Sequence, residues 1–185
     1  AELTADMMNE STSKHSSEEI SVELQKLGSS VSFSADEDGT TMYISSLTKN
    51  IDATLEIAKE KLLNPAFNKG DFNRVKKQTI EGLESMKKNG QYLGFSYFGN
   101  QLFGNTPFGR ITTEKTIKKI KLSDIQGYYN NNYSPSVSSL IIVGDVDKEA
   151  ILSKLNFLRE WKSKTVDIPV NFDYPTINET QIYLL

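Results

Sequence analysis

Residues 24–43, LQKLGSSVSFSADEDGTTMY, decide the fold class of this 185-residue chain. The stretch opens as the end of a helix, which Gly28 terminates. Val31 and Phe33 then alternate with serines, and the alternation returns at Met42, which predicts two strands that each bury one face. The turn sequence DEDG between them favours a hairpin. We expect an α+β fold with helices packed on one face of a mainly antiparallel sheet.

Helical periodicity extends on both sides of this hairpin. Helices are predicted over residues 1–10, from a Ser16 cap to Gly28, from an Asn50 cap to Asn64, and over 71–88 with Phe72, Val75, Leu83 and Met86 inward. Further helices are predicted over 91–103, in two short segments of which Ser123 caps the second, and from an Asp147 cap with Ile151, Leu155 and Leu158 along it. The near-continuous apolar run in 138–143 predicts a central strand of the sheet.

The same reading predicts how the chain is divided. We expect one subdomain over 1–162, a linker over 163–178 that holds two prolines without periodicity, and the first strand of a following, truncated subdomain over 179–185. The chain begins at Ala1 without an initiator Met, so we interpret it as a piece of a larger protein. The face that a missing subdomain leaves exposed is expected to pair artificially with another copy.

Composition excludes several classes of partner. The net charge of −3 argues against nucleic acid and against an anionic membrane surface. Lysines cluster at 76–77, 87–88 and 118–121, but at helical spacing among acidic and apolar residues, which favours solvated helix faces. The longest aliphatic run, 140–143, is far shorter than the ~20 residues of a membrane span. With no cysteine, the redox compartment cannot be read from the sequence.

Catalytic chemistry has few candidates here. One histidine, His15, and no cysteine cannot build a zinc site from Cys or His ligands, and no spacing supports an all-carboxylate site. His15 stands just before a helix cap in a polar stretch, so we expect an ordinary exposed loop histidine. Five aromatic residues in helix 91–103 are expected in the core or in helix packing, with a ligand groove as the alternative: Tyr92, Phe95, Tyr97, Phe98 and Phe103.

The order of many short motifs is more specific than any one of them. They are LQKLGSSVSFSA at 24–35, DGTTMY at 38–43, LNPAF at 63–67, FNRVKK at 72–77, LFGNTPFG at 102–109, YSP at 133–135 and IIVGDVD at 141–147. In this order and spacing, the chain resembles the M16 peptidase family, the pitrilysin and insulinase group, to about residue 160.

The resemblance implies an architecture and a division of labour. Such proteins contain two homologous halves, each of two α+β subdomains, that close around an unfolded peptide. One half carries zinc through His-x-x-Glu-His on a helix and a Glu roughly 75 residues later. The two His at i and i+4 hold the metal, and the Glu between them activates water.

This chain departs from the family where that chemistry lies. The five motif positions are ELTAD at 2–6, so neither zinc histidine is present and Ala5 replaces the water-activating Glu. The later Glu falls near Glu81 and Gly82, with Gly82 the better match. We therefore assign no catalytic residue and no metal ligand, and the substrate-binding residues stay unknown.

The sequence thus resembles the first subdomain of a zinc-free half. We expect it to complete the peptide-binding chamber of a zinc metalloendopeptidase, with zinc and hydrolysis in the other half of its own chain or in a homologous zinc-bearing partner chain. The substrate would be an unfolded peptide. The alternative is a structural or assembly subunit of a degenerate homologue without peptidase activity, and a weaker third reading is a protein-binding scaffold.

Overall fold

The computed structural model describes residues 1–168 and 171–183 and divides into two compact units. Unit 1 comprises Ala1–Asn73 and Lys121–Val166, and unit 2 comprises Arg74–Ile120 and Asp167–Leu185. The two units are described separately below.

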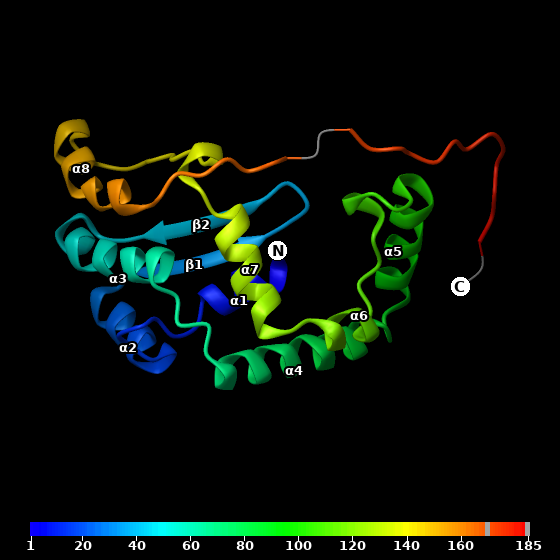
Figure 1. The fold of residues 1–185 in the computed structure, drawn as a ribbon, viewed down its shortest axis with the longest axis horizontal. Helices are drawn as coiled ribbons and strands as arrows, with labels where there is room; N and C mark the ends of the chain where they lie inside the picture. The colour runs from blue at the N-terminus through cyan, green and yellow to red at the C-terminus, as the bar shows by residue number, and fades with distance from the viewer. Residues whose placement is uncertain (169–170, 184–185) are drawn as a thin grey trace. The chain divides into compact units, whose positions relative to one another are not determined.

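Unit 1 combines an antiparallel hairpin with helices (Figure 1). Its elements are α1 (Glu2–Met8), α2 (Ser17–Leu27), β1 (Ser30–Ala35), β2 (Thr40–Ser45), the 3-10 turn η1 (Thr48–Asn50), α3 (Ile51–Leu63), the first residues of α4 (Lys69–Met86), α7 (Leu122–Asn132), η3 (Pro135–Val137), α8 (Lys148–Lys154) and η4 (Asn156–Glu160). Helices α1, α2 and α3 all contact β1. The predicted mixture of helices with an antiparallel sheet is confirmed.

The hairpin has the register that its alternation predicts. Val31 pairs with Ile44 and Phe33 with Met42. Val31 and Phe33 are buried, whereas the serines that alternate with them, Ser30, Ser32 and Ser34, are exposed. One face of the two-stranded sheet therefore belongs to the core, because successive side chains of a strand point to opposite faces.

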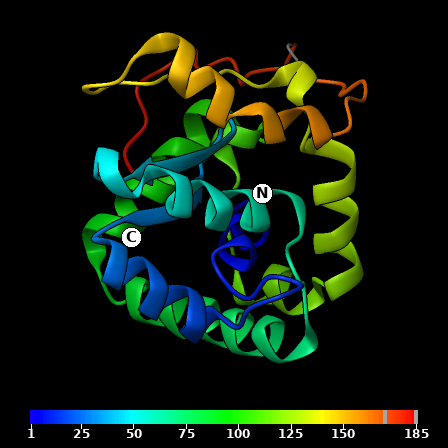
Figure 2. The same cartoon turned by 90° about the vertical axis from the view of Figure 1, so that its left-hand side faces the viewer.

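Helix α1 lies inside unit 1, against β1 and α7 (Figure 2). Leu3, Met7 and Met8 are each at most 5% exposed. Just after the helix, the Asn9 side chain accepts a hydrogen bond from Phe33 N at 2.7 Å and donates one to Phe33 O at 2.8 Å. Its amide thus takes the place of a neighbouring strand at the edge of β1, where backbone groups would otherwise be unpaired.

Most predicted helix ends are confirmed, with two corrections. Ser16 forms the capping box, Gly28 ends α2 in the left-handed region at φ 58°, and Asp147 caps α8. Asn50 is the cap position of α3, but its side chain donates to Leu27 O at 2.7 Å instead of capping. Ser123 does not cap α7, because the helix begins at Leu122 after Lys121.

The final predicted helix is shorter than expected. Helix α8 ends at Lys154, so Leu155 lies between α8 and η4, and Leu158 belongs to the 3-10 turn η4. Ile151 is buried, at 8% exposed.

The predicted central strand at 138–143 is wrong. These residues form no strand, and Ile141 and Val143 are 85% and 92% exposed. No backbone hydrogen bond joins residues 139–143 to any other part of the described chain. An apolar run of this kind becomes a strand only when a neighbouring strand accepts its backbone groups, and the described residues supply none.

Unit 2 contains the rest of α4, α5 (Gly90–Phe103), the turn η2 (Pro107–Gly109) and α6 (Glu114–Lys119). Lys87 of the loop after α4 pairs with Glu114 at 2.6 Å. Leu83 is buried as predicted, but Met86 is 48% exposed, so its predicted inward position is wrong. Gly109 packs so closely on the backbone around Gly104 that a Cβ would overlap it, which explains the Gly-rich loop.

The C-terminal segment has no regular structure in its described part. Residues 162–168 and 171–183 form no helix or strand. Two residues of the predicted linker, 169 and 170, and the last two of the predicted strand at 179–185 lie outside the described residues. The domain boundaries stay a prediction.

Candidate functional site

The residues that the resemblance predicts to correspond to the zinc motif, 2–6, lie on α1. Glu2 and Asp6, at the predicted positions of the two histidines, are exposed at i and i+4 on one side of the helix. Ala5, at the position of the water-activating Glu, is 1% exposed and offers no proton acceptor. This face of α1 therefore presents two carboxylates and no imidazole.

The negative charges on this face of α1 repel one another. Partial burial raises the pKa of Asp6 above its ordinary value, and the negative charges of Glu2 and Glu10 raise it further, against the opposing amino group of Ala1. This exposed face of α1 is acidic, and no residue of unit 1 adds a third metal ligand to it. Across residues 1–168 and 171–183, no group of three or more His, Cys, Asp or Glu gathers as a metal site would require.

The two candidate positions for the downstream ligand lie on α4, in unit 2. Glu81 pairs with Lys77 at 3.6 Å, one helical turn away. Gly82 has open space where a Cβ would be. Both therefore have ordinary helix-surface environments.

His15 lies in a loop and is half exposed, with its Nδ1 2.9 Å from Glu60 Oε2. Thr12 Oγ1 donates to the same carboxylate oxygen at 3.1 Å, and Lys14 reaches the other at 3.4 Å. Burial opposes ionisation of Glu60, but the hydrogen bonds from His15, Lys14 and Thr12 outweigh it and lower the pKa of that carboxyl. A threonine, a histidine and a carboxylate lie together here, as in a catalytic triad, but the Thr12 hydroxyl and the His15 ring each bond Glu60 and do not bond each other's side chain. The cluster therefore fastens the loop to α3.

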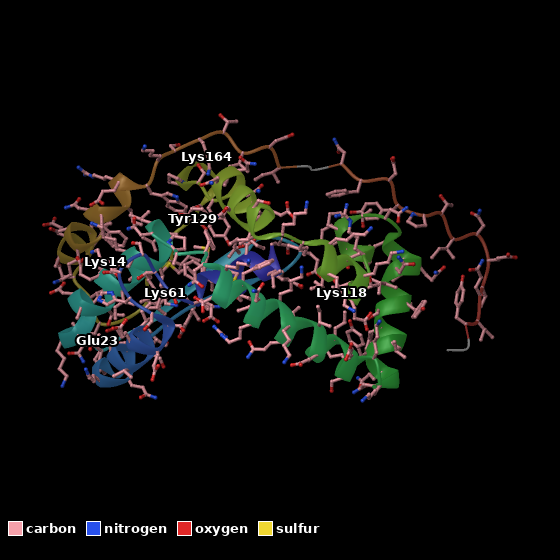
Figure 3. The ribbon with its side chains drawn as sticks, turned by 60° about the horizontal axis from the view of Figure 1, so that its bottom comes forward. Lys14, Glu23, Lys61, Lys118, Tyr129 and Lys164 are labelled. Carbon is pink, nitrogen blue, oxygen red and sulfur yellow. The ribbon has the colours of Figure 1, made fainter. Side chains whose placement is uncertain are left out.

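Lys61 of α3 is the functional-type residue that the sequence reasoning missed. It is 2% exposed and lies within unit 1 (Figure 3). Its Nζ donates to Asn9 O at 2.7 Å and to Met8 O at 3.4 Å, at the carboxyl end of α1. In the sequence, its position three residues after Ala58 places it beside the apolar stripe of α3 but does not by itself indicate that a lysine is buried.

The aromatic helix α5 is exposed. It contains no buried residue, and Phe95 and Phe98 are 67% and 61% exposed. The prediction that these two rings belong to the core is wrong, and the alternative of a ligand groove gains support. Gln91, Gly94, Phe95 and Phe98, here called the α5 face, line an open hollow of about 300 Å³.

Comparison with known proteins identifies the family. Residues 1–116 match the family model described as Insulinase (Peptidase family M16), and residues 119–184 match that of the Peptidase M16 inactive domain.

Relatives of known sequence are distant and longer. Mitochondrial-processing peptidase subunit beta of Saccharomyces cerevisiae is 24% identical over 143 residues, which are 76% of this chain and 31% of that protein. The Non-peptidase homolog YmxG of Helicobacter pylori is 24% identical over 158 residues, 84% of this chain and 37% of that protein. The chain thus spans about a third of the length of these relatives.

Solved structures share the fold. A peptidase M16 inactive domain from Pseudomonas fluorescens superposes with a TM-score of 0.85 and 20% identity over 91% of this chain and 42% of that one. A protease from Helicobacter pylori superposes with a TM-score of 0.81 and 20% identity, covering 94% and 43%.

The chain belongs to the insulinase family, Peptidase family M16. Within it, the chain is a non-catalytic M16-like domain, since it keeps the fold and matches the inactive-domain model over its second part. None of the described helices combines the length and the apolar composition that crossing a membrane requires.

Proposed function

We propose that this domain belongs to the zinc-free half of an M16-type metalloendopeptidase. It completes the chamber that holds an unfolded peptide, and a separate zinc-bearing half, in its own polypeptide or in a partner chain, performs the hydrolysis. The observation that carries the proposal is α1, which keeps its buried helix while Glu2, Ala5 and Asp6 occupy the three chemical positions of the zinc motif.

The chemistry of α1 supports this division of labour. A catalytic zinc site needs three protein ligands and an open position for water. The α1 face offers two carboxylates, and among the described residues no third His, Cys, Asp or Glu joins them to complete such a site. Without a general base at Ala5, a water held nearby would also lack its proton acceptor.

A second candidate function is a structural or assembly subunit with no peptidase activity. The relative from Helicobacter pylori is named a non-peptidase homolog and matches 84% of this chain, which favours this alternative. The two candidates differ in one property, namely whether pairing with a zinc-bearing half produces cleavage.

The test measures zinc content and cleavage of a fluorogenic unfolded peptide. The chain alone, after dialysis, is expected to hold no stoichiometric zinc and to cleave nothing. Mixed with the zinc-bearing M16 half from the same organism, it is expected to raise cleavage above that of the zinc-bearing half alone, and a chelator should abolish the gain. One tightly held zinc per isolated chain would overturn the proposal, and pairing without any gain in cleavage would favour the structural subunit.

A further inference from the structure

The loop that follows α5 in unit 2, here called the 102–109 loop, is held in place by α5 and by its own backbone. Asn100 Nδ2 donates to Gly109 O at 2.8 Å, and Gly104 N donates to Asn100 O at the same distance. Gly109 packs directly on the backbone around Gly104. Because this support comes from within the loop and from α5, we expect the loop to keep its shape when nothing is docked on it.

Two rings of the 102–109 loop and two rings of the C-terminal segment form a closed cluster. The ring centroids of Phe103 and Phe108 lie 6.0 Å apart. Phe172 packs edge-on against Phe108 at 6.0 Å, and Tyr174 packs edge-on against Phe103 at 6.3 Å. Phe172 and Tyr174 complete the cluster, 6.5 Å from each other. Each ring thus has two ring neighbours, in the edge-on or tilted geometry that aromatic pairs prefer.

Pro175 adds a third contact between the segment and the loop. A Cβ built on Gly104 would come within 2.8 Å of the proline ring. Gly104 has a φ of 58°, which a side chain would strain, so this glycine both turns the loop and leaves room for the proline. Asp173, between the two aromatic residues of the segment, is exposed. The contacting side chains therefore follow the pattern aromatic, any residue, aromatic, proline, since alternate side chains of an extended segment point to one side.

The segment is held by side chains and not by backbone pairing. No backbone hydrogen bond joins the described residues 171–183 to α5 or to η2, although the Tyr183 hydroxyl donates to Gln101 Oε1 at 3.0 Å. Phe172 is half-buried, whereas the other described residues from 171 to 183 are exposed. An aromatic pair changes an equilibrium constant by roughly 2- to 10-fold, so the two pairs between segment and loop favour the docked state roughly 5- to 100-fold. The segment is therefore docked most of the time and opens often.

We propose that the 102–109 loop is a docking site for an extended segment with the pattern aromatic, any residue, aromatic, proline, and that residues 172–175 occupy it as a reversible intramolecular latch. The occupant is the chain's own segment, because its three contacting side chains are seated on Phe108, Phe103 and Gly104. The latch gives a segment without regular structure a defined path along unit 2. The inference goes beyond the proposed function and does not depend on it, since it involves no residue of α1.

The test empties the site and supplies the segment as a separate peptide. The whole chain with Phe172→Ser and Tyr174→Ser, here called the emptied chain, is titrated against fluorescein-labelled Asn-Phe-Asp-Tyr-Pro-Thr-Ile-Asn, the sequence of residues 171–178. Fluorescence anisotropy is expected to give a Kd of roughly 10–200 µM, since a tethered segment acts at an effective concentration on the order of 1 mM. The unchanged chain should bind the peptide at least about fivefold more weakly, because its own segment competes for the site.

Matched controls on both partners separate docking from nonspecific binding. A peptide in which Ser replaces both aromatic residues should bind the emptied chain at least about fivefold more weakly, and this comparison leaves the protein itself unchanged. In the emptied chain, Phe108→Ser should weaken binding by roughly 2- to 10-fold. Phe95→Ser should leave binding unchanged, because Phe95 is an exposed ring of unit 2 outside the cluster of four rings. Circular dichroism verifies that each variant is folded.

Several results would overturn the inference. The site does not exist if the emptied chain fails to bind the peptide at about 1 mM, or if the peptide without rings binds equally well. The site is not occupied by the chain's own segment if the unchanged and the emptied chain bind the peptide equally. If sedimentation shows that the unchanged chain self-associates and the emptied chain does not, the segment docks on a second copy, which refutes the intramolecular latch.

Discussion

The buried amine of Lys61 makes a quantitative prediction about stability and pH. Lys61 is 2% exposed, and burial lowers its pKa from 10.5 to about 8, although the negative charge of Glu10 opposes the shift. The carbonyls of Met8 and Asn9 stabilise its charge only in part, since they replace the full hydration of an ammonium group.

The direction and the size of the effect follow from these two values. The unfolded chain keeps the Lys61 proton up to pH 10.5, whereas the folded chain releases it near pH 8. Because the unfolded state binds more protons between these values, the free energy of unfolding rises with pH through this window. The destabilisation is fully present below pH 8, and at ~1.4 kcal/mol per pH unit it amounts to roughly 3 kcal/mol. Raising the pH from 7 to 10 should recover roughly 2.5 kcal/mol of it.

Urea denaturation at pH 7, 8, 9 and 10, followed by the fluorescence of Trp161, measures this slope. Trp161 belongs to unit 1, as Lys61 does. The series ends at pH 10 because Tyr133, whose pKa is raised to about 12 mainly by burial, works in the opposite direction above it. Lys61→Met should lose the pH-dependent rise. Lys59→Met is the control, since Lys59 lies on the same helix and pairs with Glu160 at the surface.

The two variants give a clear contrast at the ends of the range. At pH 7, Lys61→Met should be at least as stable as the unchanged chain, because the buried charge is gone. At pH 10 it should be less stable by about 1 kcal/mol, because the neutral amine still donates to Asn9 O and methionine cannot. Equal slopes for the unchanged chain and Lys61→Met would refute the reasoning.

Three further predictions concern packing and pairing. Gly109→Ala should destabilise unit 2 by about 3 kcal/mol in thermal unfolding, because a Cβ there overlaps the backbone around Gly104. Gly82→Ala has open space around it and should instead stabilise α4 by about 1 kcal/mol. Equal effects of the two substitutions would contradict the packing argument. Asn9→Ala should cost about 2 kcal/mol in urea denaturation, since it removes both hydrogen bonds to the backbone of Phe33, and a loss below ~0.5 kcal/mol would show that water replaces them. The unpaired run at 139–143 should make the chain self-associate in sedimentation experiments, and Ile141→Lys should suppress this; association that is unchanged in the variant would locate the contact elsewhere.

Local signals in the sequence predict the structure correctly where neighbouring residues decide it. The Ser16 cap, the end of α2 at Gly28 and the hairpin at 30–45 each depend on residues within a few positions of one another. At the turn, the Asp36 side chain accepts hydrogen bonds from the backbone of Asp38 and Gly39, a geometry that the DEDG sequence carries with it.

Sequence signals predict the structure less well where the outcome depends on a residue far away in the chain. The apolar run at 138–143 has the sequence pattern of a buried strand, but no other described strand pairs with it through backbone hydrogen bonds. Asn50 stands at the start of α3, but its amide bonds Leu27 because the end of α2 lies within reach. Lys61 is buried because the open carbonyls that follow α1 meet it, and no pattern within α3 reports where α1 ends.

The candidate site also combines features that residue identity determines with features that only the packing of the chain determines. The amino-acid sequence determined the family and the absence of zinc histidines at residues 2–6, because both are properties of residue identity and order. Only the folded structure decided that Phe95 and Phe98 stand exposed beside a hollow and that Lys61 is buried. Periodicity indicates which residues share a face of a helix, but the packing of distant segments determines whether that face is covered.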